Sequence, residues 1–193
     1  MIVGITGGTG SGKTTLLKSI EACGGLILDC DAIYHELLAS DRNMLAAIEA
    51  RFPGTVENQV LDRKKLGKMV FSDPEELEAL NRISHAYVAY EVTERLREFA
   101  MSGGKLAALD AIELISSGVS KCCDVVIGVL SDKEKRAERI VKRDSISKEA
   151  AIMRIEAQRD DGYFRDNCDY ILYNNATEED FCDSVINLLT EVL

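Results

Sequence analysis

A glycine-rich segment near the amino terminus has the composition of a phosphate-binding loop. Residues 7–14 read Gly-Gly-Thr-Gly-Ser-Gly-Lys-Thr and fit the pattern G-x-x-x-x-G-K-[ST], between an apolar run at 2–6 and a segment of helical periodicity. In such a loop, backbone N–H groups converge on a phosphate, the helix amino terminus adds partial positive charge, and the lysine adds a full charge. The residues predicted to bind a nucleoside polyphosphate are Gly8, Thr9, Gly10, Ser11, Gly12, Lys13, Thr14 and Thr15.

The same loop predicts a metal ion. The hydroxyl that directly follows the loop lysine is the side chain that ligates Mg²⁺ in loops of this kind, where the ion bridges two phosphates of the nucleotide. In this chain that residue is Thr14. We therefore expect Mg²⁺ as a cofactor, held by the Thr14 hydroxyl.

Two carboxylates, Asp29 and Asp31, follow the second apolar run of the chain. Strand ends in open α/β sheets face the ligand crevice, so these side chains are expected beside the phosphates. We interpret Asp31 as the group that accepts or orients the proton of an attacking hydroxyl. The alternative role for such a residue is to cap the helix that follows, and we assign that structural role to Asp29.

A short segment carries six cations in a chain that is acidic as a whole. The segment is 133–143, and Ser131 and Glu134 predict a capping box that starts a helix there. Guanidinium groups can hold the charge that spreads over a phosphoryl group during transfer, which favours a lid over the phosphates; the alternative is a solvated helix face. The cations are Lys133, Lys135, Arg136, Arg139, Lys142 and Arg143.

Strand-like and helical segments alternate along most of the chain, the pattern of a parallel sheet with crossover helices. The expected strands are 2–6, 26–28, 106–110, 124–130 and 170–173, and helical periodicity replaces the strand signal between 40 and 102. Asp73 followed by Pro74, Ser147, and Thr177 with Asp180 each indicate a helix start. The predicted fold class is α/β: a P-loop NTPase core with a five-stranded parallel sheet, a helical insertion subdomain and a helical lid.

These segments indicate a single domain in which a helical insertion at 40–102 interrupts the sheet. A chain of 193 residues has the length of one domain with an elaboration, which agrees with this division.

Composition excludes several classes of protein. A net charge of −10 disfavours a protein that binds nucleic acid or an anionic membrane. The amino terminus has neither a basic region nor a long apolar stretch, so no signal peptide or membrane span is expected and the protein is expected in the cytoplasm. The six cysteines form no metal-binding pattern, and we interpret them as reduced core thiols.

Taken in order, the motifs resemble those of the dephospho-coenzyme A kinase family. The similarity runs from the phosphate loop through the D-x-D segment that ends at Asp31, a segment 62–66 that contains Arg63, and an L-N-x-x-x-H pattern that ends at His85. It continues through Arg139, Arg143 and the segment 170–175. The resemblance implies ATP-dependent phosphorylation of the ribose 3′-hydroxyl of dephospho-CoA, the last step of coenzyme A biosynthesis.

The resemblance implies a single P-loop kinase domain in three parts. The core is expected at 1–39, 103–131 and 161–193, the helical substrate-binding subdomain at 40–102, and the lid at 132–160.

The resemblance also implies roles for individual residues. Lys13 and Asp31, with Arg139 and Arg143 over the transferring group, are the expected catalytic residues, and Asn174 is expected near adenine. The partner is a small molecule, dephospho-CoA, and the chain is expected to be a monomer or a weak homo-oligomer. The residues expected to bind the acceptor are Asp31, His35, Arg63, His85 and Asp110.

The departures from the family pattern lie on the acceptor side. Ala86 stands where proline usually follows the histidine, and His35 stands where arginine is common. In the stretch after Asp110, Ile112 and Ser116 occupy positions of a proline and a glutamate, so Glu113 is the carboxylate available to replace the latter. Two alternatives therefore stay open: a kinase of another small metabolite or nucleoside monophosphate, and a P-loop regulatory protein with a degenerate acceptor site.

Overall fold

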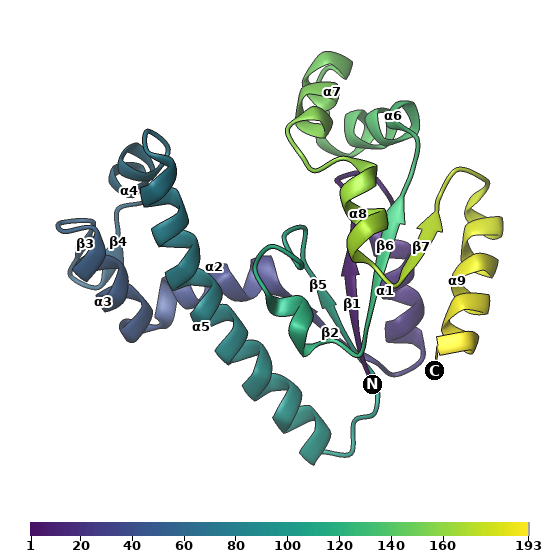
Figure 1. Ribbon diagram of the computed structural model, residues 1–193, viewed down its shortest axis with the longest axis horizontal. Helices are drawn as coiled ribbons and strands as arrows, with labels where there is room; N and C mark the ends of the chain where they lie inside the picture. Colours follow the sequence, from purple (N-terminus) through teal and green to yellow (C-terminus); the bar gives the residue numbers. More distant parts are fainter. Residues whose placement is uncertain (193) are drawn as a thin grey trace.

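A five-stranded parallel sheet forms the core of the computed structural model, which describes residues 1–192 (Figure 1). Its spatial order is β2-β5-β1-β6-β7. All five strands were expected, within a residue or so of their observed ends, because apolar runs without alternation suit strands that are buried on both faces. The strands are β1 (Ile2–Thr6), β2 (Leu26–Asp29), β5 (Ala107–Asp110), β6 (Val125–Leu130) and β7 (Tyr170–Tyr173).

Helices cover both faces of this sheet. Helices α1 (Lys13–Ala22) and α9 (Glu178–Val192) pack on one face, where Leu16 and Phe181 join the apolar residues of β1 and β6. The other face is covered by the second half of α5 (Pro74–Met101) and by the short helix η1 (Val119–Cys122). Helix α8 (Asp161–Asn167) packs against β6 and β7. The sheet is thereby held rigid, and its carboxyl edge stays free for a site.

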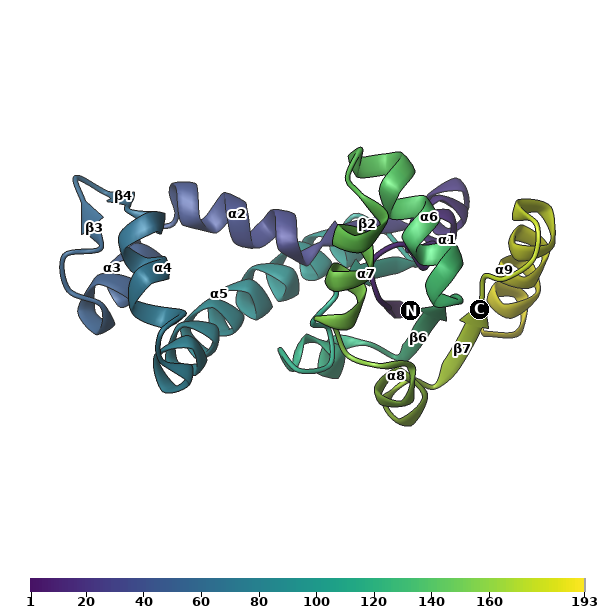
Figure 2. The same cartoon turned by 90° about the horizontal axis from the view of Figure 1, so that it is seen from above.

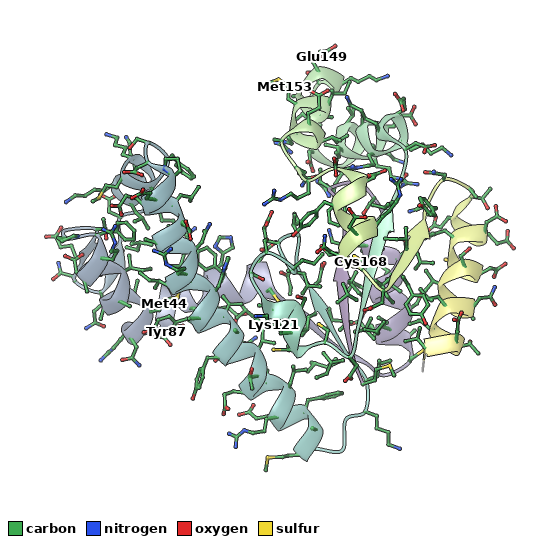
Figure 3. All side chains as sticks on the ribbon, viewed as in Figure 1. Met44, Tyr87, Lys121, Glu149, Met153 and Cys168 are labelled. Atoms are coloured by element: carbon green, nitrogen blue, oxygen red, sulfur yellow. The ribbon has the colours of Figure 1, made fainter. Side chains whose placement is uncertain are left out.

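A helical extension projects from the sheet between β2 and β5. Helix α2 (Cys30–Ser40) and the long α5 connect it to the core, and α3 (Arg42–Arg51) and α4 (Arg63–Val70) lie at its far end (Figures 1 and 2). Met44 of α3 and Tyr87 of α5 belong to one apolar cluster that continues under the sheet (Figure 3). This shared cluster joins the extension firmly to the core.

The extension also contains a small β-hairpin, which corrects the expectation that 40–102 is purely helical. Strands β3 (Val56–Glu57) and β4 (Val60–Leu61) pair antiparallel, and the turn residues Asn58 and Gln59 both have positive φ. This backbone suits a two-residue hairpin turn, which glycine usually fills at its second position. Because Gln59 occupies that position, the sequence lacked the usual signal.

Helices α6 (Lys133–Asp144) and α7 (Lys148–Glu156) form a pair at the carboxyl end of the sheet (Figure 1). They pack on each other through a small apolar cluster that includes Ala137, Ile140 and Ala151. Glu149 and Met153 of α7 point away from the rest of the molecule (Figure 3). The pair therefore has its own core and rests on the sheet through the residues of α6.

Most of the expected helix starts are observed. Asp29, Asp73 and Ser147 each accept hydrogen bonds from backbone N–H groups of the helix that follows, and Thr177 with Asp180 forms a reciprocal pair of bonds before α9. The expected capping box at Ser131 is wrong. Its hydroxyl donates instead to the carbonyl of Asn174 at 2.8 Å, because residue 131 is buried between the ends of β6 and β7.

All six cysteines are free thiols, but they are not all core residues as expected. Cys23 is exposed where α1 ends, and Cys30 alone is fully buried. Burial raises the pKa of the Cys30 and Cys123 thiols to about 12 each, so both stay protonated at neutral pH. Within residues 1–192, no helix combines the length and apolar character needed to cross a membrane.

The cap of α5 can be tested directly, since this helix joins the extension to the core. Replacing Asp73 by Ala removes the acceptor of the Glu75 N–H and should lower the free energy of unfolding by about 1 kcal/mol. Asn at position 73 preserves the cap and should leave stability nearly unchanged. Urea denaturation of both variants measures the difference; equal stability of the Ala and Asn variants would contradict this role of Asp73.

Candidate active site

The carboxyl ends of the sheet strands bring the predicted site residues together. The loop after β1 lies between β5 and β6, and Lys13 is the first residue of α1. Asp29 at the end of β2 is in register with Asp110 at the end of β5, and Asp110 is in turn paired with Ile5 of β1. A parallel sheet thus places two carboxylates beside the phosphate loop without any long connection.

The loop is already folded around a space for an anion. The Lys13 Nζ donates to the carbonyl of Gly7 at 2.9 Å, and the amide of Ser11 donates to the carbonyl of Gly8. Gly12 has φ 106, and a Cβ there would lie 2.0 Å from the side-chain nitrogen of Asn174. Only glycine therefore fits at position 12, both for its backbone and for its contact with the end of β7.

A cavity of about 430 Å³ opens above the loop. It brings together residues of the loop, the β2 and β5 ends and the α6 helix, and most of them are residues singled out in the sequence. Asp29, interpreted there as structural only, both caps α2 and lines this cavity. The lining residues are Gly8, Thr9, Gly10, Ser11, Gly12, Lys13, Thr14, Asp29, Asp31, Asp110, Ile112, Arg139 and Arg143.

Charges in the cavity act on one another. Burial lowers the pKa of the Lys13 ammonium, while the neighbouring Asp110 and Asp31 oppose that effect. Burial also raises the pKa of the Asp31 carboxyl, and repulsion by Asp29 raises it further. The pKa of Asp110 is raised for the same first reason. The site therefore concentrates ionisable groups whose charged forms are disfavoured by burial and would be stabilised by a ligand of opposite charge.

The donor set around Thr14 fits a hard divalent cation. Asp110 has one buried oxygen, Oδ1, without a hydrogen-bond partner. Asp110 and Thr14 line the same cavity. Unpaired carboxylate and hydroxyl oxygens are ligands that Mg²⁺ prefers, with water and phosphate oxygens completing the shell. Among residues 1–192 no group of three or more His, Cys, Asp or Glu side chains could hold a metal by itself.

Arg139 and Arg143 reach the loop from α6. The Arg139 guanidinium donates to the carbonyls of Gly10 and Ser11 at 3.1 and 3.3 Å and to both oxygens of Asn174. Arg143 donates to Asp144 and, at 3.3 Å, to the Thr9 hydroxyl. Both side chains line the cavity, so neither guanidinium belongs to a purely solvated helix face.

Asn174 lies behind the loop rather than in the first cavity. Its side-chain nitrogen donates to the carbonyl of Ser11 at 2.9 Å, and the residue is buried. A second hollow of about 260 Å³ lies next to it, between the loop and α9. This hollow is lined by Gly12, Thr15, Arg139, Asn174, Glu178 and Phe181.

A third cavity, of about 180 Å³, lies on the side of the helical extension. Burial lowers the pKa of His85 there, with the neighbouring Glu113 opposing the effect, and the hydroxyl of Ser84 is buried without a partner. Asp31 lines both this cavity and the one above the loop. The lining residues are Cys30, Asp31, Tyr34, Asn81, Ser84, His85, Val88, Ala111, Glu113, Ser117 and Val119.

Comparisons with known proteins decide the family. The sequence model of a family described as dephospho-CoA kinase matches residues 1–180. The chain belongs to the dephospho-CoA kinase family. A protein of Dehalococcoides mccartyi named dephospho-CoA kinase is 33% identical over 196 residues, which cover 98% of this chain and 96% of that protein.

Solved structures show the same fold. The crystal structure of TT1252 from Thermus thermophilus is 30% identical with a TM-score of 0.79, over 100% of this chain and 98% of that one. A dephospho-CoA kinase from Campylobacter jejuni, 24% identical with a TM-score of 0.69 over 99% and 96% of the two chains, shares the fold. The chain is thus an ATP-dependent kinase of the dephospho-CoA kinase family, and the expected family, fold and enzyme class are confirmed.

Two residues expected to bind the acceptor lie outside the cavities. His35 is exposed on α2; it lines none of the three cavities described above, although its charge favours the anionic form of Asp31. Arg63 begins α4 at the far end of the extension and is absent from the same three linings. Their roles stay predictions.

Sequence reasoning missed Ser84, and it gave no individual role to Arg136, one of the six clustered cations, or to Gln158, part of the family resemblance. Ser84 lines the cavity on the helical extension, Arg136 of α6 donates to the Thr9 carbonyl, and Gln158, in the turn after α7, accepts the Thr9 amide. Ser84 sits on the buried side of α5, one residue before His85, so the L-N-x-x-x-H pattern contained its position. Nothing in the sequence distinguished Arg136 from the other cations of α6.

The repulsion between Asp29 and Asp31 predicts a measurable pKa change. Replacing Asp29 by Asn keeps the cap of α2, since Asn caps helices as well as Asp does, but removes the charge that raises the pKa of Asp31. The Asp31 carboxyl should then titrate at lower pH, as measured by carboxyl-carbon NMR. The same substitution at Asp41, the cap of α3, is the control and should not move it. An unmoved titration in Asp29→Asn would mean that burial alone raises the pKa.

Proposed function

We propose that this enzyme transfers the γ-phosphoryl group of ATP to the ribose 3′-hydroxyl of dephospho-CoA, the last step of coenzyme A synthesis. The observation that carries this proposal is the position of Asp31, which lines both the cavity above the phosphate loop and the cavity on the helical extension. A donor phosphate in one cavity and an acceptor hydroxyl in the other would meet at this carboxylate. That arrangement is what direct transfer between two small molecules requires.

On the donor side, the loop amides and Lys13 hold the β- and γ-phosphates, and Arg139 and Arg143 contact the transferring group from α6. Adenine occupies the hollow beside Asn174, against the Arg139 guanidinium. Each part of the chain has its own role. The core at 1–39, 103–131 and 161–193 binds ATP, and residues 132–160 act as a lid. Residues 40–102 bind the acceptor together with the amino-terminal end of α2 and the segment after β5.

The Thr14 hydroxyl and the unpartnered oxygen of Asp110 would hold Mg²⁺. When bound, the ion neutralises charge on the phosphate oxygens during transfer. Asp110 thereby contributes to the metal shell and to the electrostatic balance of Lys13. This assignment differs from a direct contact between Asp110 and the acceptor.

Asp31 takes the proton in the reaction. As the acceptor oxygen bonds to the γ-phosphorus, the bond from phosphorus to the β–γ bridging oxygen breaks, ADP leaves, and the hydroxyl proton passes to the Asp31 carboxylate. Lys13 and His35 favour the anionic form of Asp31 that this step needs, against burial and Asp29. The positive charge of Lys13 thus serves two purposes: it binds the phosphates and it favours the anionic form of Asp31.

The acceptor cavity offers several polar groups to a nucleotide-like molecule. Asn81, Ser84 and His85 come from consecutive turns of α5, and Glu113 faces them from the segment after β5. Ser116 donates to the Glu113 carboxylate. We infer that Glu113, so oriented, replaces the carboxylate that the family usually has at position 116.

We further propose that the enzyme acts on small molecules as a monomer or a weak homo-oligomer. The six free thiols agree with a reducing compartment, the cytoplasm.

A substrate panel tests the proposed reaction. The purified chain is incubated with ATP and Mg²⁺ and with dephospho-CoA, nucleoside monophosphates or other small alcohols, and product formation is followed by mass spectrometry. Transfer to dephospho-CoA with the highest kcat/KM supports the proposal. Preferred transfer to another acceptor, or ATP hydrolysis that no acceptor accelerates, would sink it in favour of another metabolite kinase or a regulatory ATPase.

Asp31→Asn tests the base. The substitution preserves shape but removes the proton acceptor, so kcat should fall by about a hundredfold to ten-thousandfold while ATP affinity stays nearly unchanged. Asp183→Asn, an exposed position on α9, is the control and should retain full activity. Steady-state kinetics and ATP titration calorimetry measure the two effects; undiminished turnover in Asp31→Asn would show that another group takes the proton.

A further inference from the structure

Arg136 is buried behind the phosphate loop. Its side chain belongs to the cationic helix α6, yet the residue is only 5% exposed, and it is the one lysine, arginine, aspartate or glutamate among the buried residues of 1–192. Burial lowers the pKa of this guanidinium, with Asp161 opposing the effect. A buried charge is retained in a fold only where specific partners compensate for its lost hydration.

Arg136 and its two partners, Thr9 and Gln158, are joined pairwise by hydrogen bonds, and we call these three residues the Thr9 clamp. Arg136 donates from Nε to the Thr9 carbonyl at 2.9 Å and from a terminal nitrogen to the Gln158 side-chain oxygen at 3.0 Å. The same Gln158 oxygen accepts the Thr9 amide at 2.9 Å. Both backbone groups of Thr9 are therefore fixed by lid residues that lie 127 and 149 positions away.

The two residues of the clamp that hold Thr9, Arg136 and Gln158, lie outside the phosphate cavity, which Thr9 itself lines. Neither Arg136 nor Gln158 lines that cavity, whereas Arg139 and Arg143 of the same helix do. The Arg136 guanidinium covers the outer side of Gly8 so closely that a Cβ there would lie 2.1 Å from its nitrogen. Because the Thr9 amide is bonded to Gln158, this amide is not free for a phosphate.

We propose that Arg136 is a positioning residue that acts through the Thr9 clamp: it fixes the turn at Thr9 so that the following loop amides already face the phosphates before ATP binds. This inference rests on the loop being the ATP site, and it goes beyond the roles assigned above to Arg139 and Arg143. A preformed loop does not have to be ordered when the nucleotide binds, which raises affinity. Arg136 itself touches no substrate.

Direct binding of ATP tests the clamp without the acceptor, so the result does not depend on which alcohol is phosphorylated. Arg136→Met keeps an unbranched apolar stem but removes all donors. Titration calorimetry with ATP and Mg²⁺ should show the Kd rise by about tenfold or more, since hydrogen bonds from a charged group are lost. Lys142→Met removes one exposed cation from the same helix and is the charge-matched control; its Kd should change by less than about twofold.

A second pair of measurements separates positioning from folding. Gln158→Met should weaken ATP binding as Arg136→Met does, and the double variant should bind no more weakly than either single variant, because all three break the same clamp. Backbone hydrogen exchange in the absence of ATP should become faster at residues 8–11 in each. A residue that only stabilised the fold would lower the fraction of binding-competent protein while leaving the Kd of that fraction unchanged.

Three results would overturn the proposal: an unchanged Kd in folded Arg136→Met, an equal rise in Kd in Lys142→Met, or single effects that multiply in the double variant. If Arg136→Met does not fold, Arg136→Lys decides. A lysine at 136 keeps one donor for Thr9 but cannot bridge to Gln158, so its Kd should lie between those of the wild type and Gln158→Met. A wild-type Kd in both Arg136→Lys and Gln158→Met would be equally fatal to the proposal.

Discussion

The balance of charge around the Lys13 ammonium is the interaction on which the rest of the site depends. Partial burial removes water from this lysine and lowers its pKa, and the nearby Asp110 and Asp31 carboxylates oppose that effect. Those carboxylates can reach the lysine only because β2, β5 and β1 are adjacent and parallel, with their carboxyl ends at one edge. The strand order therefore places Asp31 and Asp110 close enough to act on the charge of Lys13.

This local balance explains how an acidic protein can bind a polyanion. The net charge of −10 lies mostly on solvated surfaces, whereas the cavity above the loop combines Lys13, Arg139 and Arg143 with three carboxylates. Asp29 and Asp31 repel each other in the free enzyme, and Asp110 keeps an oxygen unpartnered. Bound phosphates with a divalent cation would supply what each of these groups lacks, so the site suits a polyanion bound together with a cation rather than an anion alone.

The features predictable from sequence are those that depend on local chemistry. The loop pattern, five apolar strands and the caps at Asp29, Asp73, Ser147 and Thr177 all depend on residues within a few positions of one another, and each is observed. The hairpin at 56–61 lacked a glycine signal, and Ser131 bonds across to Asn174 instead of capping α6. Arg136 differs from five neighbouring cations only in where α6 packs. The Ser131 and Arg136 outcomes are set by tertiary contacts that a linear pattern does not contain, whereas the hairpin lacked its usual local signal.

The acceptor side shows how departures from a family pattern can be compatible with a retained site. Serine at position 116 removes a carboxylate, yet its hydroxyl donates to Glu113, which lines the same cavity as His85. The backbone segment that carries Glu113 and Ser116 is fixed by Thr6, which lies directly beside the phosphate loop. The Thr6 hydroxyl donates to the carbonyl of Ile112 at 3.1 Å. Glu113 therefore has a defined position relative to the donor site without the proline that the family usually has at 112. Under the proposed function, a carboxylate three positions earlier in a fixed turn can serve the acceptor as well as the one that was lost.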